Sequence, residues 1–534
     1  MAESSDKRSS IHTWLAARSP WQRRGLALLA GASATLGHAP FQLTLVFVAA
    51  ISLLVWLMDG AHARERRLGS AFALGWWFGL GHMATGLYWV SSAFNVDSNA
   101  WGPLWGIPLT ALLAVVLALF FGLGCFLAML FWTRDWRRLP AFAVALFVSE
   151  WLRGHALFGG FPWILPGYVW TPGEPVSQMA SLVGIYGLSL LTLLAAAAPA
   201  AVADAGQGVG RRFAPLMVVA LLVGMAWGWG AQRLAHAAID LPGALPVVRV
   251  ADSGLGQAEK WDARADQEWR VLRRYLDASG AAEASDAAIV VWPEGAIPVI
   301  NFFMLENPEF LDALGRGLGD RVLIAGLSRR AAMADGVAYY NSAAVIDGVS
   351  GVPRIGQIYD KHRRVPFGEY IPFWSLVSSF NLAPLQRIGA GFEQGAPPAR
   401  LIIPDAPPAT ALICYEAIFP GMVPRGEGRP GWIASVTNDA WFGAGTGPWQ
   451  HYAMGRYRTI EEGLPLARAA SGGVSAIVDS YGRQIAATSG GARFAEAQLP
   501  PALVETPFAR YGNFLLLALL LFIATLRAFP AARA

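Results

Sequence analysis

Long runs of apolar residues fill the first 235 positions of the chain and return near its C-terminus. A helix that crosses a membrane needs about 20 mostly apolar residues. Runs that approach this length predict eight transmembrane helices, at residues 25–39, 41–59, 70–94, 103–132, 139–152, 176–203, 213–235 and 512–529. The pattern therefore predicts a membrane domain of seven helices at 1–235 and an eighth transmembrane helix within 512–530.

Residues 240–508 have a different pattern, in which short β-branched runs alternate with amphipathic stretches. Runs of this kind predict strands and helices in alternation. The expected strands lie at 244–251, 287–294, 321–328, 338–347, 354–361, 409–415, 431–438 and 474–480, and the expected helices at 262–278, 307–317 and 448–463. Strands that are apolar on both faces must be covered on both sides, which predicts a layered α/β sandwich.

Basic residues gather at alternate ends of the predicted spans. They precede the first and seventh spans and fill "HARERR" (62–67) and "RDWRR" (134–138), whereas "GHAPF" and "NVDSNA" contain none. Cytoplasmic loops carry the excess of Lys and Arg. The alternation therefore predicts that both termini are cytoplasmic and that residues 240–508 lie on the opposite side of the membrane.

Composition agrees with a membrane protein that carries a soluble part. Hydrophobic residues make up 54% of the 534 positions and charged residues 15%, against about 25% charged in soluble proteins. The two cysteines form no disulfide framework, no Cys/His spacing fits zinc, and no Gly-rich loop has the sequence of a phosphate cradle. We expect no cofactor, no metal and no nucleic-acid partner. Cys125, inside "FGLGCFLAML", has the setting of a buried small residue.

Cys414 is different, because it stands where the apolar run "ATALICYEAIFP" (409–420) ends. Two other predicted strands also end on ionisable residues, Glu294 in "VVWPEGAIP" and Lys361 in "IYDKHRRVPFGEYIP". A thiol is mostly protonated at neutral pH and needs a base or a nearby positive charge to become a nucleophile. Glu294 would accept the proton, and Lys361 would stabilise the thiolate and the oxyanion of an attacked carbonyl.

Taken one at a time, these residues also have ordinary structural interpretations. Cys414 would be a core residue, Glu294 a turn residue, and Lys361 part of a solvated basic patch. Their occurrence together at strand ends, in the order Glu, Lys, Cys, favours catalysis by a nucleophilic cysteine.

The segments "WPEGAIP", "YDKHRRVPFGEYIP", "CYEAIFP" and "TNDAWFG" resemble the nitrilase superfamily. Combined with the membrane spans, the whole chain resembles the apolipoprotein N-acyltransferases of bacteria. This resemblance implies an extracytoplasmic α-β-β-α sandwich on an eight-helix domain in the bacterial inner membrane. It also implies transfer of an acyl chain from a phospholipid, mainly the sn-1 chain of phosphatidylethanolamine, through a Cys thioester to the α-amino group of a diacylglyceryl-cysteine apolipoprotein.

The resemblance also assigns roles to residues that match the family motifs. It implies that Glu294 is the general base, Lys361 the oxyanion stabiliser and Cys414 the nucleophile. The remaining matches are supporting or substrate-binding residues, namely Glu369 in "PFGEY", the pair Tyr415 and Glu416, Trp261 in "EKWD" on a mobile arm, and Asn438 in "TNDAWFG". The aromatic loop at 153–175 begins with "RGHALFGGFPW", which is similar to the family's loop between the fifth and sixth spans.

Two departures and several alternatives stay open. The family's V-Q-x-N before the Trp is replaced by "RVADSGLGQAEKW", and Leu464 follows "EEG" where Arg is frequent. Glu416 would alternatively be a structural partner of Lys361, and His451 on the last expected helix a structural residue. A membrane-anchored amidase or nitrilase-type hydrolase is the alternative enzyme, and a transporter or scaffold with a binding domain is the alternative class.

Overall fold

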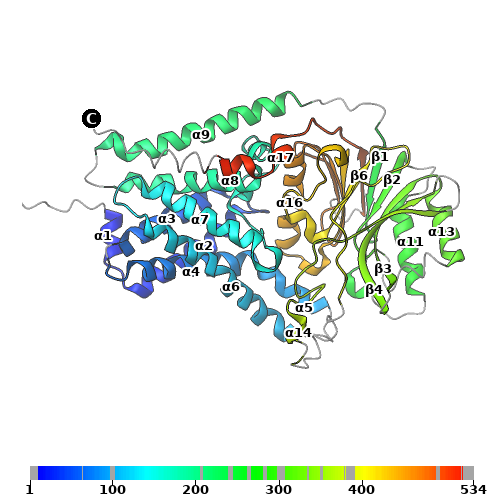
Figure 1. The fold of residues 1–534 in the computed structure, drawn as a ribbon, viewed down its shortest axis with the longest axis horizontal. Coiled ribbons are helices and arrows are strands. Elements are labelled where there is room, and N and C mark those ends of the chain that lie inside the picture. The colour runs from blue at the N-terminus through cyan, green and yellow to red at the C-terminus, as the bar shows by residue number, and fades with distance from the viewer. Residues whose placement is uncertain are drawn as a thin grey trace, which may run out of the picture.

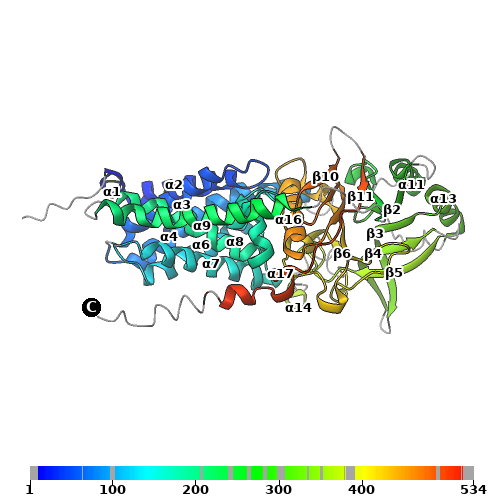
Figure 2. The ribbon, with the colours of Figure 1, turned by 90° about the horizontal axis from the view of Figure 1, so that it is seen from above.

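A computed structural model describes most of the chain. The described residues are 10–62, 64–96, 103–204, 208–237, 245–260, 266–280, 285–296, 307–333, 336–348, 353–377, 379, 391–488, 493–518 and 520. Figures 1 and 2 both show helices at one end of the molecule and sheets at the other, with helix α16 (Gly447–Glu462) between them.

The N-terminal helices form a bundle that shares one apolar core (Figure 1). The described helices of this bundle are α1 (Ser10–Ala16), α2 (Pro20–Ala34), α3 (Thr44–His62), α4 (Arg67–Gly86), α5 (Ala93–Val96), α6 (Pro103–Leu130), α7 (Arg138–His155), α8 (Ala180–Ala197) and α9 (Val209–Ala235). Glycines allow close approach between α2 and α4: a Cβ on Gly31 would collide with the Phe78 carbonyl, and one on Gly81 with the Leu28 carbonyl. Small residues at helix contacts are typical of helices that pack within membranes.

Four helices within the described ranges are long and apolar enough to cross a membrane. They are Thr44–His62, Leu104–Leu130, Val176–Ala203 and Val209–Ala235, and they coincide with four of the predicted spans. Helices α2, α4 and α7 form where three further spans are predicted, but α2 has only 15 residues and α7 contains the buried ion pair Glu150–Arg153. The eighth predicted span lies mostly outside the described residues, so the number eight stays a prediction.

The C-terminal part of the chain contains two β-sheets. The first has the strand order β11-β1-β2-β3-β4-β5 and the second the order β10-β9-β8-β7-β6. The strands are β1 (Val247–Ala251), β2 (Ala287–Trp292), β3 (Val322–Met333), β4 (Gly336–Asp347), β5 (Arg354–Asp360), β6 (Ala409–Ile413), β7 (Trp432–Asn438), β8 (Leu466–Ser471), β9 (Ala476–Val478), β10 (Gln484–Ala487) and β11 (Phe494–Gln498). Strands β1, β2 and β3 are parallel, as are β6, β7 and β8.

The two sheets pack face to face, and helices cover their outer faces. Apolar residues of both sheets form one core between them. Helices α11 (Gln267–Ser279) and α13 (Pro308–Leu318) pack on the outer face of the first sheet, and α16 packs on the outer face of the second. The arrangement confirms the predicted α/β sandwich and is an α-β-β-α stack.

Helix α16 belongs to two cores at once. Its Tyr452 packs against the second sheet, while Met454, Tyr457 and Ile460 belong to the core of the helical bundle. Polar contacts strengthen the second attachment, because the Tyr457 hydroxyl donates to the carbonyl oxygen of Trp170 at 2.7 Å and Arg456 donates to that of Pro172 at 2.6 Å. The sheet edge that carries the candidate site is therefore held against the bundle.

Candidate active site

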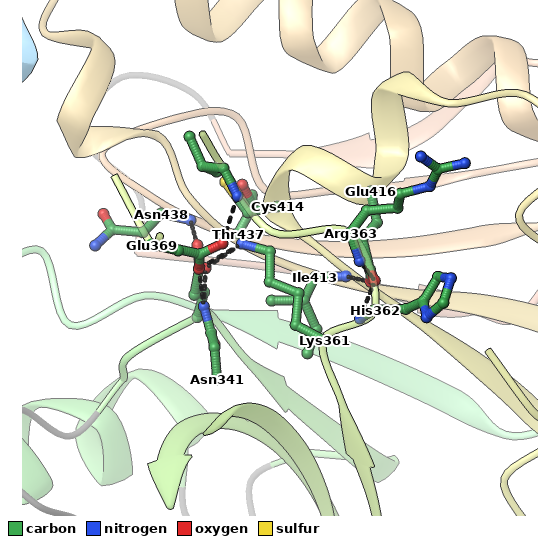
Figure 3. Close-up of polar contacts among 12 residues, drawn as sticks. Asn341, Lys361, His362, Arg363, Glu369, Ile413, Cys414, Glu416, Thr437 and Asn438 are labelled. Atoms are coloured by element: carbon green, nitrogen blue, oxygen red, sulfur yellow. Dashed lines mark hydrogen bonds and ion pairs between the residues drawn. The ribbon is translucent and has the colours of Figure 1, made fainter. Parts of the chain in front are cut away.

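The three predicted reactive residues lie one or two positions after the ends of three strands. Glu294 comes after β2, Lys361 after β5 and Cys414 after β6, and Figure 3 shows Lys361 and Cys414 in one cluster of polar contacts. The Lys361 ammonium lies 3.1 Å from Glu294 Oε1, although 67 residues separate the two in sequence. The structure thus brings together residues that the sequence analysis grouped from their strand-end positions.

Lys361 is buried between two carboxylates. Its Nζ donates to Glu294 Oε1 at 3.1 Å and to Glu369 Oε1 at 2.9 Å. Burial opposes the positive charge, but the negative charges of Glu294 and Glu369 outweigh it and raise the pKa of Lys361. Lys361 is therefore an ammonium ion held between the two acids.

Asn341, on β4, is a site residue that the sequence analysis missed. Its side-chain amide donates to Glu294 Oε1 at 2.6 Å and to Glu369 Oε1 at 2.7 Å, so it bridges the same two carboxylates as Lys361 (Figure 3). The one available signal was a buried amide inside the apolar strand "AYYNSAAVID". A buried polar side chain needs partners, and here the partners are the two acids.

Asn438 contributes through its backbone. Its N–H, at the end of β7, donates to Glu294 Oε2 at 3.0 Å. The resemblance implies a supporting role for Asn438. This contact fixes the second oxygen of the Glu294 carboxylate.

Cys414 is buried and has an unusual backbone conformation. Its φ is +47°, in the left-handed region that non-glycine residues rarely adopt. Burial raises the pKa of the Cys414 thiol, and the charge of Glu294 adds to the rise, while the charge of Lys361 and a hydrogen bond with Thr437 oppose it. The thiol is therefore protonated at rest and needs a base when it attacks.

Glu416 binds backbone groups rather than the Lys361 ammonium. Its Oε1 accepts from the N–H groups of His362 and Arg363 at 2.7 and 3.0 Å and from the Tyr359 hydroxyl at 2.7 Å, and its Oε2 accepts from the Ile413 N–H at 2.8 Å. Burial raises the pKa of Glu416, although these hydrogen bonds oppose the rise. Glu416 thus ties the segment after Lys361 to the strand end before Cys414.

Tyr415 points toward the helical bundle. Its hydroxyl donates to the carbonyl oxygen of Gly160 at 3.1 Å, and its ring meets Phe419 edge-on with centroids 5.1 Å apart. Gly160 lies in the aromatic loop at 153–175 that the sequence analysis singled out. Tyr415 therefore links the residue after the candidate nucleophile to this loop.

Trp261 lies outside the described residues, but the residue before it is firmly held. Lys260 is buried, and its Nζ donates to the Tyr275 hydroxyl at 2.9 Å and to Ser471 Oγ at 2.7 Å. Within the described ranges, no group of three or more His, Cys, Asp or Glu side chains is placed to hold a metal ion.

The fold and the clustered Glu, Lys and Cys define a nitrilase-like domain attached to a bundle of apolar helices. Residues 249–506 match the family model for carbon-nitrogen hydrolases, and residues 30–198 match the model for the apolipoprotein N-acyltransferase N-terminal domain. An apolipoprotein N-acyltransferase of Rhodopseudomonas palustris is 37% identical over 96% of this chain and 96% of that one. The chain belongs to the apolipoprotein N-acyltransferase family.

Other relatives with that name give the same result. The Bradyrhizobium diazoefficiens protein is 40% identical over 92% of each chain. The Caulobacter vibrioides protein is 36% identical over 94% of this chain and 93% of its own. The similarity therefore extends across both the helical bundle and the sandwich.

Proposed function

We propose that the protein N-acylates lipoproteins. In this proposal, Cys414 takes an acyl chain from a phospholipid, most readily the sn-1 chain of phosphatidylethanolamine, and holds it as a thioester. The chain then passes to the α-amino group of the diacylglyceryl-cysteine that begins an apolipoprotein. The observation that carries the proposal is the buried cluster of Glu294, Lys361 and Glu369, in which the charges of Glu294 and Lys361 act on the Cys414 thiol.

In the first step Glu294 acts as the general base. Each carboxylate oxygen offers about two lone-pair positions, and both positions on Glu294 Oε1 are used by Asn341 and Lys361. Oε2 accepts only the Asn438 N–H among the described residues, which leaves it a position for the thiol proton. As Sγ bonds to the ester carbonyl carbon, Glu294 takes the thiol proton and then gives it to the departing lysophospholipid oxygen.

Lys361 is the proposed oxyanion donor. An ammonium has three N–H groups, and two of them bind Glu294 and Glu369 in the described structure. The third can donate to the oxygen that becomes negative in the tetrahedral intermediate. We propose that the backbone N–H of Tyr415, next to the nucleophile, is the second donor.

In the second step the α-amine of the apolipoprotein attacks the thioester. Glu294 accepts a proton from the amine and returns it to the sulfur as the C–S bond breaks, so that an amide forms and the thiol is restored. Because both substrates use the same cysteine in turn, the reaction follows a ping-pong order.

Lipid substrates explain why the domain is attached to apolar helices. Each buried CH₂ contributes about 0.8 kcal/mol, so a 16-carbon chain would cost about 10 kcal/mol or more to withdraw from a bilayer. We propose that residues 1–235 and 512–530 hold the 240–508 domain at the periplasmic face of the bacterial inner membrane, with both termini in the cytoplasm. The acyl chains would then stay partly in lipid during transfer.

Intact-protein mass spectrometry tests the proposal. The protein in detergent is incubated with phosphatidylethanolamine, and the wild type is compared with Cys414→Ala. We expect an added acyl mass on the wild type that hydroxylamine removes and that the variant lacks. Addition of a diacylglyceryl lipopeptide should discharge the mass onto the peptide amine.

The same experiment separates the alternatives. Release of free fatty acid without transfer to the lipopeptide would identify a hydrolase that uses water as acceptor. Absence of any acyl mass on folded wild-type protein would overturn Cys414 as the covalent carrier. A transporter or scaffold would show neither acylation nor hydrolysis.

A further inference from the structure

His451, on α16, is buried beside the candidate nucleophile and has no role in the proposed proton transfers. Its Nε2 lies 3.1 Å from the carbonyl oxygen of Cys414, and its Nδ1 lies 2.8 Å from Asp439 Oδ1. A carbonyl oxygen only accepts, so Nε2 carries a hydrogen. Arg468 Nη2 lies 2.5 Å from Asp439 Oδ2 and 3.3 Å from His451 Nδ1. Asp439 and Arg468 thus hold one edge of the ring, while the Nε2–H on the other edge donates to the Cys414 carbonyl.

Aromatic rings from the helical bundle and from the loop before α16 surround the imidazole. Trp163 stacks on it with centroids 5.7 Å apart and planes 27° apart, and Phe442 meets it edge-on at 5.5 Å. Stacked and edge-to-face contacts are the preferred arrangements of aromatic pairs. Trp163 lies between α7 and α8, so this contact comes from the bundle and not from the sandwich.

The Trp163 ring is itself fixed in place. Its Nε1 donates to Gln450 Oε1 at 2.8 Å, and Trp89 donates to the same oxygen at 3.1 Å. Phe161 stacks nearly parallel to Trp163, with centroids 5.8 Å apart. The packing around Trp163 thus fixes the ring that stacks on the imidazole.

The carbonyl that His451 holds belongs to the peptide unit between Cys414 and Tyr415. A trans peptide is planar, and its C=O and N–H point in opposite directions. A hydrogen bond that fixes the Cys414 carbonyl therefore also aims the Tyr415 N–H. The left-handed φ of +47° at Cys414 is a conformation that persists only when its surroundings hold it, and this bond is one such restraint.

We propose that His451 is a positioning residue that transmits the packing of Trp163 to the Cys414–Tyr415 peptide and so aims an oxyanion donor at the reacting carbonyl. The inference rests on the proposed function, because it assumes that Cys414 is acylated. It means that the helical bundle completes the catalytic geometry in addition to anchoring the domain.

Single-turnover acylation of Cys414 tests this role. Two donors are used separately, phosphatidylethanolamine and the soluble ester p-nitrophenyl butyrate, which needs no lipid site. His451→Phe fills the space of the ring but donates no hydrogen bond, and we expect its acylation rate at saturating donor to fall about 10- to 100-fold. The final fraction of acylated protein should stay complete, because positioning changes the rate and not the amount of folded enzyme. His451→Gln, which restores an N–H donor, should recover part of the rate.

A double-mutant cycle tests the link to the bundle. Trp163→Leu removes the stacked ring and should slow acylation in the wild-type background, while Trp163→Phe, which keeps a ring, should slow it less. In the His451→Phe background, Trp163→Leu should change the rate by no more than about twofold, because coupled residues are not additive. Trp170→Leu is the matched control: this tryptophan is in the same loop, and its indole binds Thr192.

Each outcome decides a different claim. Three results would overturn the positioning role. They are an acylation rate of His451→Phe within twofold of wild type, additive effects in the double-mutant cycle, and a fall in the acylated fraction that matches the fall in rate. If p-nitrophenyl butyrate acylates the wild type and phosphatidylethanolamine does not, the proposal of a phospholipid donor is wrong. The role of His451 is then still tested with the soluble ester. If neither ester acylates the wild type, both the acylation of Cys414 and the positioning role of His451 are overturned.

Discussion

The charges around Cys414 determine where its proton goes. Lys361 carries one positive charge between the two carboxylates Glu294 and Glu369, so the buried group is negative by one before the thiol is counted. Loss of the thiol proton to solvent would add a second buried negative charge, which is costly. Transfer of the proton to Glu294 keeps the charge constant. This is the physical reason to expect a general base rather than a resting thiolate.

Glu294→Gln tests this argument through pH. The amide cannot accept the proton, so we expect acylation at pH 7 to fall about 10²- to 10⁴-fold. The negative charge of Glu294 contributes to the raised pKa of Cys414, so its removal lowers that pKa. The residual rate should therefore increase as pH rises from 6 to 10, because more thiol ionises. Glu294→Asp, which keeps a carboxylate base, should lose less of the acylation rate. An acylation rate of Glu294→Gln within tenfold of wild type at pH 7 would contradict the assignment of Glu294 as the general base.

Asn341→Asp tests the bridge between the two acids. The substitution keeps the shape of the side chain but replaces two hydrogen-bond donations, to Glu294 and Glu369, by repulsion. We expect acylation to slow by about 100-fold, equivalent to about 3 kcal/mol. Acid should restore part of the rate, since a protonated Asp can donate one hydrogen bond. Single-turnover acylation between pH 5 and 8 measures both effects, and a flat profile at the wild-type rate would argue against the bridge.

At the scale of elements, the sequence predicted those strands whose composition is typical of buried sheet. Strands β2 and β7, "AAIVVW" and "WIASVTN", are rich in β-branched and aromatic residues, and both form where expected. Strands β8, β10 and β11 were missed because "LARAAS", "QIAA" and "FAEAQ" are dominated by Ala and polar residues, which are poor strand formers in isolation. Their pairing with neighbouring strands decides their conformation.

The candidate site shows the same division between local and long-range information. Glu294, Lys361 and Cys414 were predicted because a polar residue that ends an apolar strand is a local signal. The bridging role of Asn341 and the direction of Tyr415 depend on which strands and loops become neighbours, and no local pattern contains that. For the same reason, Glu416 was weighed as a partner of Lys361, although it binds the backbone beside it.

Lys260 gives a prediction for the short helix α10 (Gln257–Lys260), which precedes Trp261. Burial lowers the pKa of Lys260, and the charge of Asp252 opposes this decrease. Burial raises the pKa of Asp252, and the charge of Lys260 opposes this increase. Lys260→Met would leave the half-buried Asp252 without its cation, and we expect a loss of about 3 kcal/mol in the free energy of unfolding. Lys260→Met combined with Asp252→Asn should recover most of this loss in denaturant unfolding. If the double variant is as unstable as the single one, the two charges are not coupled.

At the scale of the whole molecule, α16 makes the bundle and the sandwich one mechanical unit. One part of the helix packs on the second sheet through Tyr452, and another part packs in the bundle core through Tyr457. Glu461 adds a polar attachment, because its Oε1 accepts the Ile185 N–H at 2.7 Å just after Gly184 interrupts α8 with a φ of +66°. The helix that carries His451 therefore cannot move relative to the bundle without breaking buried bonds.

Tyr457→Phe tests whether this attachment stabilises the whole protein. The substitution removes the hydroxyl that donates to the Trp170 carbonyl oxygen at 2.7 Å and lies 3.2 Å from that of Gly167, so an acceptor in the bundle loses its partner. We expect a loss of about 1 to 3 kcal/mol, seen as a lower midpoint in thermal unfolding followed by circular dichroism in detergent. Tyr452→Phe is the matched control, because its hydroxyl binds Gln484 within the sandwich and its loss should cost about 0.5 to 1 kcal/mol. Equal shifts for the two variants would mean that the contact with the bundle adds no stability beyond an ordinary hydrogen bond.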